Sequence, residues 1–239
     1  MIGRVVVFDA AGTLVDVVGS VGEAYAEEAR AAGADLDPAE IERGFGRAMR
    51  AAPPLAFGHL PPEARGSAAR GWWRAVAGAA LAAAGELPTG FAFESFFDRA
   101  WERFSRPDAW QVHVDVRPAL RALRARGVPL AVFSNWDERL KPLLTGLGLG
   151  GYFCRVIVSS DLPAAKPSRD AFEAVARELA NVESAHGPPV MIGDRLDHDA
   201  LPAMAAGWDA VWLDRAGGNG APGSVRVARD LRELPSLLG

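Results

Sequence analysis

Polar side chains that could do chemistry follow four apolar runs of the chain, either directly or after a short loop. They are Asp9 and Thr13, then Ser134 and Asn135, then Lys166, and finally Asp194 and Asp199. Two carboxylates with further oxygen donors make a site for a hard cation, most simply Mg²⁺. A lysine with hydroxyl and backbone donors makes a cradle for a tetrahedral anion. Together with a carboxylate nucleophile, this set predicts phosphoryl transfer through an aspartyl-phosphate.

The elements that would position these side chains form a parallel sheet. Five apolar runs are too short for helices and rich in β-branched residues, as is typical of buried parallel strands. They span residues 4–8, 129–133, 155–158, 189–192 and 210–213. Helical patterns alternate with the later runs, which favours helices on both faces of the sheet. Because ligands bind beyond the carboxyl ends of the strands in such sheets, we expect the polar clusters to meet in one crevice.

The stretch after the first run breaks this alternation. It is almost entirely helical in period, with helices expected at 19–32, 38–51, 63–84 and 93–105 and with proline-containing loops between them. We therefore predict a Rossmann-like α/β core made of residues 1–14 and 111–239. Residues 15–110 are predicted to form an all-helical domain inserted into that core.

Composition and charge exclude several classes of protein. The 239 residues carry a formal net charge of −4, whereas nucleic-acid binders usually present a basic face. No apolar run reaches the roughly 18 residues of a membrane span. The single cysteine, Cys154, can form no internal disulfide, which favours a reducing compartment. We expect a cytoplasmic protein that binds neither nucleic acid nor membrane, and the sequence identifies no protein partner.

The polar clusters, in this order, resemble the four motifs of the haloacid dehalogenase-like (HAD) hydrolases. They read Asp9-x-x-Gly12-Thr13-Leu14, Ser134-Asn135, Lys166-Pro167 and Gly193-Asp194-x-x-x-x-Asp199. The helical insert resembles the cap domain of the helical-cap subclass of that family. The resemblance implies that Asp9 is the nucleophile, and that Mg²⁺ is held by Asp9, Asp194 and the backbone carbonyl of Ala11.

The same resemblance implies roles for the remaining candidates. Asp9, Thr13 and Lys166 are expected to be catalytic, while Ser134, Asn135 and Lys166 are expected to bind the substrate phosphate. Asp199 matches the acid that supports the metal site and the lysine. The expected substrate is a small phosphorylated metabolite, because a cap that closes over the crevice would exclude large substrates.

At one position the chain departs from the phosphatases of that family, which usually carry a second Asp two residues after the nucleophile. The residue here is Ala11, which can neither protonate the leaving oxygen nor activate the hydrolytic water. Losing a positioned acid/base typically costs about 10²–10⁴-fold in rate. We therefore expect a metal-dependent phosphatase with slow turnover, and Asp16 and Asp137 are candidates for a substitute acid.

Three other interpretations stay open. A HAD fold that has lost its activity would serve as a binding or interaction protein. A haloacid dehalogenase would also lack the second Asp, but it would lack a metal-binding acid at the position of Asp194 as well. A phosphonoacetaldehyde hydrolase would need a lysine in the cap, and residues 15–110 contain none.

Overall fold

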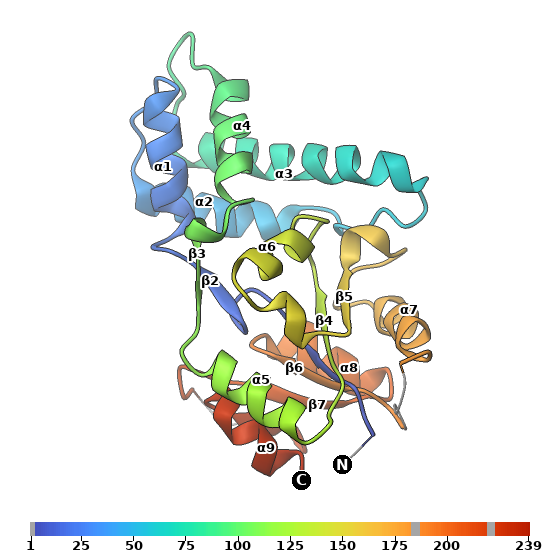
Figure 1. Ribbon diagram of the computed structural model, residues 1–239. Coiled ribbons are helices and arrows are strands. Elements are labelled where there is room, and N and C mark those ends of the chain that lie inside the picture. Colours follow the sequence, from blue (N-terminus) through green and yellow to red (C-terminus); the bar gives the residue numbers. More distant parts are fainter. Residues whose placement is uncertain (1–2, 183–186, 219–222) are drawn as a thin grey trace. The chain divides into compact units, whose positions relative to one another are not determined.

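The computed structural model describes residues 3–182, 187–218 and 223–239, and it divides the chain into two compact units (Figure 1). Unit 1 comprises Met1–Asp16, Leu55–Arg65 and Val112–Gly239, and unit 2 comprises Val17–Pro54 and Gly66–Gln111. The chain passes between the units near β2 (Val15–Val17) and β3 (Trp110–Val112), which pair in a two-stranded sheet.

Unit 1 is built on a six-stranded sheet in the order β5-β4-β1-β6-β7-β8, and its neighbouring strands all pair in parallel. The strands are β1 (Val6–Phe8), β4 (Leu130–Ser134), β5 (Arg155–Val158), β6 (Val190–Gly193), β7 (Asp209–Leu213) and β8 (Arg226–Ala228). The predicted parallel α/β sheet is thus confirmed. β8 has no counterpart among the expected strands, because its three residues include a charged one and form no apolar run.

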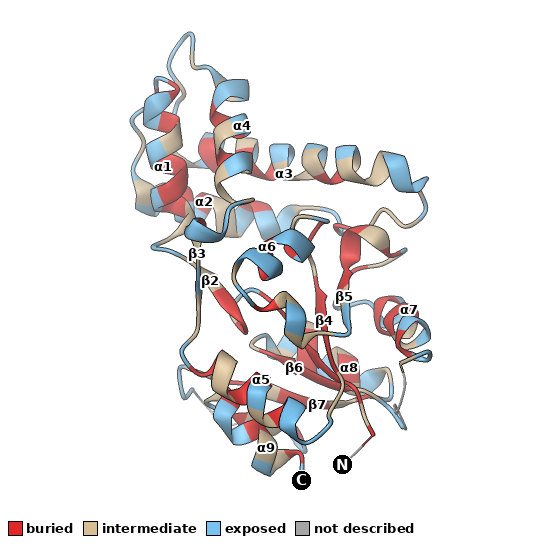
Figure 2. Cartoon of the chain, viewed as in Figure 1, coloured by how far each residue is buried: buried red, intermediate tan, exposed pale blue. Residues whose placement is uncertain are grey.

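Helices cover both faces of this sheet. α7 (Arg169–Leu179) and α8 (Leu201–Ala205) pack on one face against the buried side chains of Val7, Phe133 and Met191. Figure 2 shows the central strands buried along their length, whereas the helices alternate between buried and exposed positions. This pattern is the burial expected of a sheet enclosed between helices.

On the opposite face of the sheet, α5 (Val116–Ala125) and the end of the chain after α9 (Leu234–Leu237) lie next to β1 and β6. A cavity of about 290 Å³ lies between the sheet and these elements. Val6 and Val190 line it from the strands, and Leu123 of α5 and Leu238 line it from the other side. α6 (Leu140–Gly146) follows β4. With helices on both faces, the carboxyl ends of the strands remain the edge at which polar residues can gather.

Unit 2 contains four helices: α1 (Val21–Ala31), α2 (Pro38–Ala51), α3 (Pro62–Ala84, which begins in unit 1) and α4 (Phe93–Arg103). Ser20 starts α1 with a capping box to Glu23, and Asp37 caps α2 ahead of Pro38. The helices bury a shared apolar core that includes Tyr25, Ile41, Leu81, Phe96 and Phe97. Unit 2 therefore has its own core, as a separate helical domain requires.

One segment of the expected helical insert lies elsewhere. Leu55–Arg65 belongs to unit 1, although the predicted insert of residues 15–110 included it. Three hydrogen bonds hold it to the loop after β5: Phe57 N–H to Ser160 O (3.1 Å), Gly58 N–H to Leu162 O (2.8 Å), and Ser159 Oγ–H to Leu55 O (2.6 Å). Backbone hydrogen bonds of this kind leave no periodic pattern in the sequence. The sequence therefore predicted that this segment belongs to the helical insert, as its neighbours do.

Gly58→Ala should destabilise the protein, because a Cβ at this position would lie 2.4 Å from the backbone carbon of Leu162. Relieving such a contact requires a backbone shift, for which overpacking data suggest about 1–3 kcal/mol. Gly71→Ala is the matched control, since nothing lies within 4 Å of its Cβ on α3 and alanine favours a helix by about 0.5–1 kcal/mol. Urea unfolding of both variants checks this, and equal stability changes would contradict the docking of the segment.

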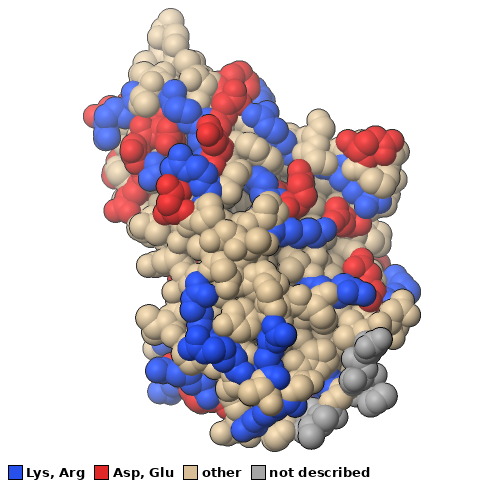
Figure 3. Space-filling model, viewed as in Figure 1, with Lys and Arg blue, Asp and Glu red and all other residues tan. Residues whose placement is uncertain are grey.

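Two surface features bear on possible partners. Figure 3 shows Lys and Arg side chains gathered over the region of α5. On and directly after α5, Arg117, Arg124 and Arg126 donate to backbone carbonyl oxygens of other segments, so these arginines help to hold unit 1 together. Within the described residues, no helix is long and apolar enough to cross a membrane.

Candidate active site

Lys166 lies between two carboxylates at the carboxyl edge of the sheet. Its Nζ donates to Asp9 Oδ1 (2.8 Å), to Asp199 Oδ1 (2.6 Å) and to the carbonyl of Phe133 (3.2 Å). Asp9 directly follows β1, and Asp199 lies in a π-helical turn, Leu196–Ala200, soon after β6. Burial alone would lower the pKa of the Lys166 ammonium, but the two carboxylates raise it above its usual value. Lys166 therefore stays charged and fixes the position of Asp9.

Asp194 directly follows β6 and is held by the turn that follows β1. Thr13 Oγ1 donates to Asp194 Oδ1 (3.1 Å) and accepts from the Asp194 backbone N–H (3.1 Å). Gly12 in the same turn has φ +77°, and a Cβ there would lie 2.4 Å from Asp194 Oδ2, so only glycine allows this approach. Burial, followed by repulsion from Asp9, raises the pKa of Asp194 from 3.8 to about 6.

These carboxylates could hold a cation. Asp9, Asp194 and Asp199 offer oxygens that lie within 4.8 Å of one another. Lys166 binds one oxygen of Asp9 and one of Asp199, whereas Asp194 has no basic partner among the described residues. The carbonyl oxygen of Ala11 likewise accepts no hydrogen bond within the described part of the chain. The donor set of Asp9, Asp194 and Ala11 therefore fits a hard cation such as Mg²⁺.

Asp194→Asn should stabilise the metal-free protein at neutral pH. The folded-state pKa of about 6 lies above 3.8, so the stability linked to this carboxyl is complete below about pH 4 and is lost as the pH rises through 6. At about 1.4 kcal/mol per pKa unit, ionisation costs roughly 2–3 kcal/mol. Urea unfolding in EDTA should show a gain of this size at pH 7.5 and a much smaller one at pH 4.5. A gain independent of pH would contradict the assignment.

Asn135 holds the backbone that carries Lys166. Its Nδ2 donates to the Lys166 carbonyl (2.8 Å), and the Lys166 N–H donates to Asn135 Oδ1 (2.9 Å). Both ends of the amide are thereby committed to positioning the lysine. Ser134 is the last residue of β4 and is buried. Binding of the substrate phosphate by Ser134 and Asn135 stays a prediction.

The side chain at Ala11 is exposed, and the two candidate substitute acids differ in their surroundings. Asp137 is fully buried, and its Oδ2 accepts from Arg139 Nη2 (2.7 Å), so it is not available to a substrate. Asp16 accepts from the Gly12 N–H through Oδ1 (3.1 Å), and its Oδ2 lies 3.1 Å from His113 Nε2. Asp16 is therefore the one of the two that lies beside the turn containing Ala11.

Two residues that support the site were missed by sequence reasoning. Trp212 of β7 donates through Nε1 to the Asp194 carbonyl (2.8 Å). Arg215, two residues beyond β7, donates to the carbonyl of Thr13 (2.9 Å). Arg215 also lies just past the fifth apolar run, so its place at a strand end is the signal that could have found it.

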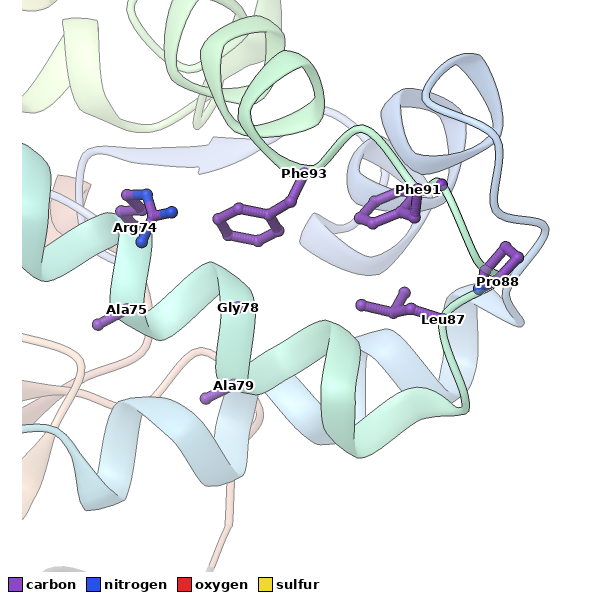
Figure 4. A pocket seen from close by; sticks show the side chains of 9 residues that line it. Arg74, Ala75, Gly78, Ala79, Leu87, Pro88, Phe91 and Phe93 are labelled. Atoms are coloured by element: carbon purple, nitrogen blue, oxygen red, sulfur yellow. The ribbon is translucent and has the colours of Figure 1, made fainter.

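A separate pocket of about 550 Å³ lies in unit 2, between α3 and the segment before α4 (Figure 4). Its walls are mostly apolar, with Phe91 and Phe93 on one side and the small residues of α3 on the other. Arg74 is the charged residue of the lining, and it is already bonded to Glu94 and stacked 4.9 Å from the Phe93 ring centroid. The lining of this pocket contains no carboxylate and no lysine, unlike the cluster around Asp9.

Comparison with known proteins gives consistent results. Residues 4–207 match the family model of haloacid dehalogenase-like hydrolases. Haloacid dehalogenase-like hydrolase domain-containing protein 3 of Mus musculus is 36% identical over 178 residues, which cover 73% of this chain and 68% of the relative.

Solved structures include both phosphatases and dehalogenases of the same fold. A HAD phosphatase from Thermococcus onnurineus is 24% identical, with a TM-score of 0.64 over 99% of this chain and 98% of its own. A 2-haloacid dehalogenase from Pseudomonas syringae pv. Tomato is 25% identical, with a TM-score of 0.63 over 100% and 98%. By its sequence match, its fold and its arrangement of Asp9, Lys166 and Asp194, the chain belongs to the haloacid dehalogenase-like hydrolases and is a hydrolase.

Proposed function

We propose that the protein is a Mg²⁺-dependent phosphatase that hydrolyses a small phosphorylated metabolite through an aspartyl-phosphate on Asp9. The observation that carries the proposal is Asp194. This carboxylate is held beside the nucleophile by Thr13, its pKa is raised to about 6 by burial and by Asp9, and it has no basic partner among the described residues. A bound divalent cation would supply the missing counter-charge, and the all-oxygen donor set suits Mg²⁺.

The residues have distinct tasks in this reaction. Asp9 attacks phosphorus with Oδ2, since Oδ1 is bonded to Lys166, and the bond between phosphorus and the leaving oxygen breaks. Water then attacks the phosphorus of the aspartyl-phosphate, which releases phosphate and restores the carboxylate. Bound Mg²⁺ would neutralise charge that develops on the phosphoryl oxygens. With alanine at position 11, the leaving oxygen takes its proton from water, so turnover is slow for poor leaving groups.

A haloacid dehalogenase is the second candidate, and Ala11 is the observation that favours it. In such an enzyme the nucleophile attacks a carbon atom and no metal is needed. A carboxylate at position 194, whose ionised form is destabilised by burial, would then have no function. Burial and repulsion from Asp9 raise the pKa of Asp194, and the more distant Lys166 offsets this only in part. No basic side chain among the described residues forms an ion pair with Asp194, which makes the metal-dependent reaction the better account. A HAD fold retained only for binding would keep the metal site without turnover.

We further infer that the protein is cytoplasmic and binds neither nucleic acid nor membrane. The single cysteine and the net charge of −4 support this inference.

Phosphate release from a panel of phosphorylated metabolites, with Mg²⁺ and with EDTA, tests the proposal. We expect release with Mg²⁺ only, and none from Asp9→Asn. Mg²⁺ should also raise the melting temperature of the parent by mass action, and much less that of Asp194→Asn. Halide release from a 2-haloacid in EDTA would establish the dehalogenase instead. A Mg²⁺-dependent rise in melting temperature without turnover on any substrate would count against the phosphatase and support a HAD fold retained for binding.

A further inference from the structure

Arg215 forms hydrogen bonds to the turn that follows Asp9, which contains Gly12 and Thr13. Its Nη1 and Nη2 donate to Oδ2 and Oδ1 of Asp115 (2.8 and 3.2 Å), which makes a two-pronged ion pair. Nη2 also donates to the Thr13 carbonyl (2.9 Å), and Nε reaches the Gly12 carbonyl (3.4 Å). Arg215 thus donates to four acceptor atoms, which a planar guanidinium with five N–H donors can do and an ammonium with three cannot.

Asp115 is built to hold this arginine. It is 1% exposed, at the start of α5, and its Oδ2 also accepts from the Leu231 N–H (2.8 Å). A buried carboxylate needs its counter-charge, so the arginine is fixed in direction as well as in position. The turn is therefore bonded by an ion pair, Arg215 with Asp115, that is itself held in place by the start of α5 and by the backbone of Leu231.

Gly12 and Thr13, whose carbonyls Arg215 binds, are also the residues that position Asp194. Thr13 bonds the Asp194 side chain and backbone, and Gly12 allows the carboxylate to lie against the turn. The same turn contains Ala11, whose carbonyl belongs to the candidate metal-binding set. A small shift of this turn would change the distances among the metal donors, even if no charged residue of the four motifs were substituted.

We propose that Arg215, oriented by Asp115, is a positioning residue that holds the Gly12–Thr13 turn so that Asp9, Asp194 and the Ala11 carbonyl keep a metal-binding geometry. The inference rests on the proposed metal-dependent function. Neither residue belongs to the motifs that suggested that function. Groups that orient metal ligands typically contribute about 10- to 100-fold to metal affinity.

Arg215→Lys is the informative variant, since it keeps the charge and removes the fork. Arg4→Lys is its matched control. Arg4 also binds one aspartate, Asp209 (2.5 Å), and two backbone carbonyls, those of Pro188 and Pro189, but it does so at the amino ends of the strands. Both substitutions remove the same kinds of bond, and only one removes them beside the site.

Two measurements are made on both variants: the Mg²⁺ dissociation constant by calorimetry, and amide hydrogen exchange of residues 9–15 in the metal-free protein. We expect Arg215→Lys to weaken Mg²⁺ binding roughly tenfold or more and to speed exchange in that segment. Arg4→Lys should change neither, whatever it does to the melting temperature. Asp115→Asn should reproduce the effects of Arg215→Lys.

The outcomes separate the two proposals. If the parent binds Mg²⁺ and Arg215→Lys binds it equally well, Arg215 is only a structural brace and this inference fails while the proposed function stands. Faster exchange without weaker Mg²⁺ binding would also reduce Arg215 to a structural brace. If the parent binds no Mg²⁺, the proposed function fails and this inference falls with it.

Discussion

Lys166→Met should destabilise the protein by about 3–5 kcal/mol at pH 7.5, because it removes the cation between two buried carboxylates. Asp199 is 1% and Asp9 8% exposed, and both lie within hydrogen-bond distance of Nζ. Burial, only partly offset by Lys166, already raises the pKa of Asp199 to about 6. Without the lysine this pKa rises further, so Asp199 must bind a proton or remain an uncompensated charge.

The stability lost in Lys166→Met should depend on pH. A carboxyl with a raised folded-state pKa loses its stabilising contribution as the pH rises, so the deficit of Lys166→Met should grow from pH 5 to pH 8. Lys141→Met is the matched control, because Lys141 is the chain's other lysine and forms an exposed pair with Asp161. An exposed pair is worth about 0–1 kcal/mol. Urea unfolding at several pH values measures both; similar deficits in the two variants, or a deficit that does not change with pH, would contradict the buried triad.

The sheet was predictable because its strands are short, continuous apolar runs, and burial on both faces demands such runs. The site was predictable for the same reason, since polar residues that follow those runs meet at one edge. Asp9, Lys166 and Asp199 meet in this way, although up to 190 residues separate them in the sequence.

What sequence reasoning missed depends on backbone groups. Leu55–Arg65 is held to unit 1 mainly through carbonyl and amide groups, which every residue type carries, so its composition did not distinguish it from the helical insert. Asn135 bonds the Lys166 backbone, and Arg215 bonds the carbonyls of Gly12 and Thr13. A sequence pattern identifies charged partners more readily than it identifies the carbonyls that a side chain will bind.

Ala11→Asp should raise kcat for alkyl phosphates by on the order of 10²-fold or more, because it restores a carboxyl able to protonate the leaving oxygen. The position accepts the change without burying a charge, since Ala11 is exposed, and its expected metal contact is made by the backbone carbonyl. Alkoxides leave poorly and need the proton most. Aryl and acyl phosphates leave readily, so any gain for them would come from faster hydrolysis of the aspartyl-phosphate.

The measurement is kcat/KM for phosphate esters whose leaving-group pKa runs from about 4 to about 15. The parent should show a steep decline as the leaving group becomes more basic, and Ala11→Asp should flatten it. Ala11→Asn is the control, because it adds similar bulk but cannot donate a carboxyl proton. If the parent already hydrolyses alkyl phosphates as fast as aryl phosphates, another group supplies the proton. Asp16, which lies beside the same turn, would then be the residue to replace, and a steep decline in Asp16→Asn would identify it as that acid.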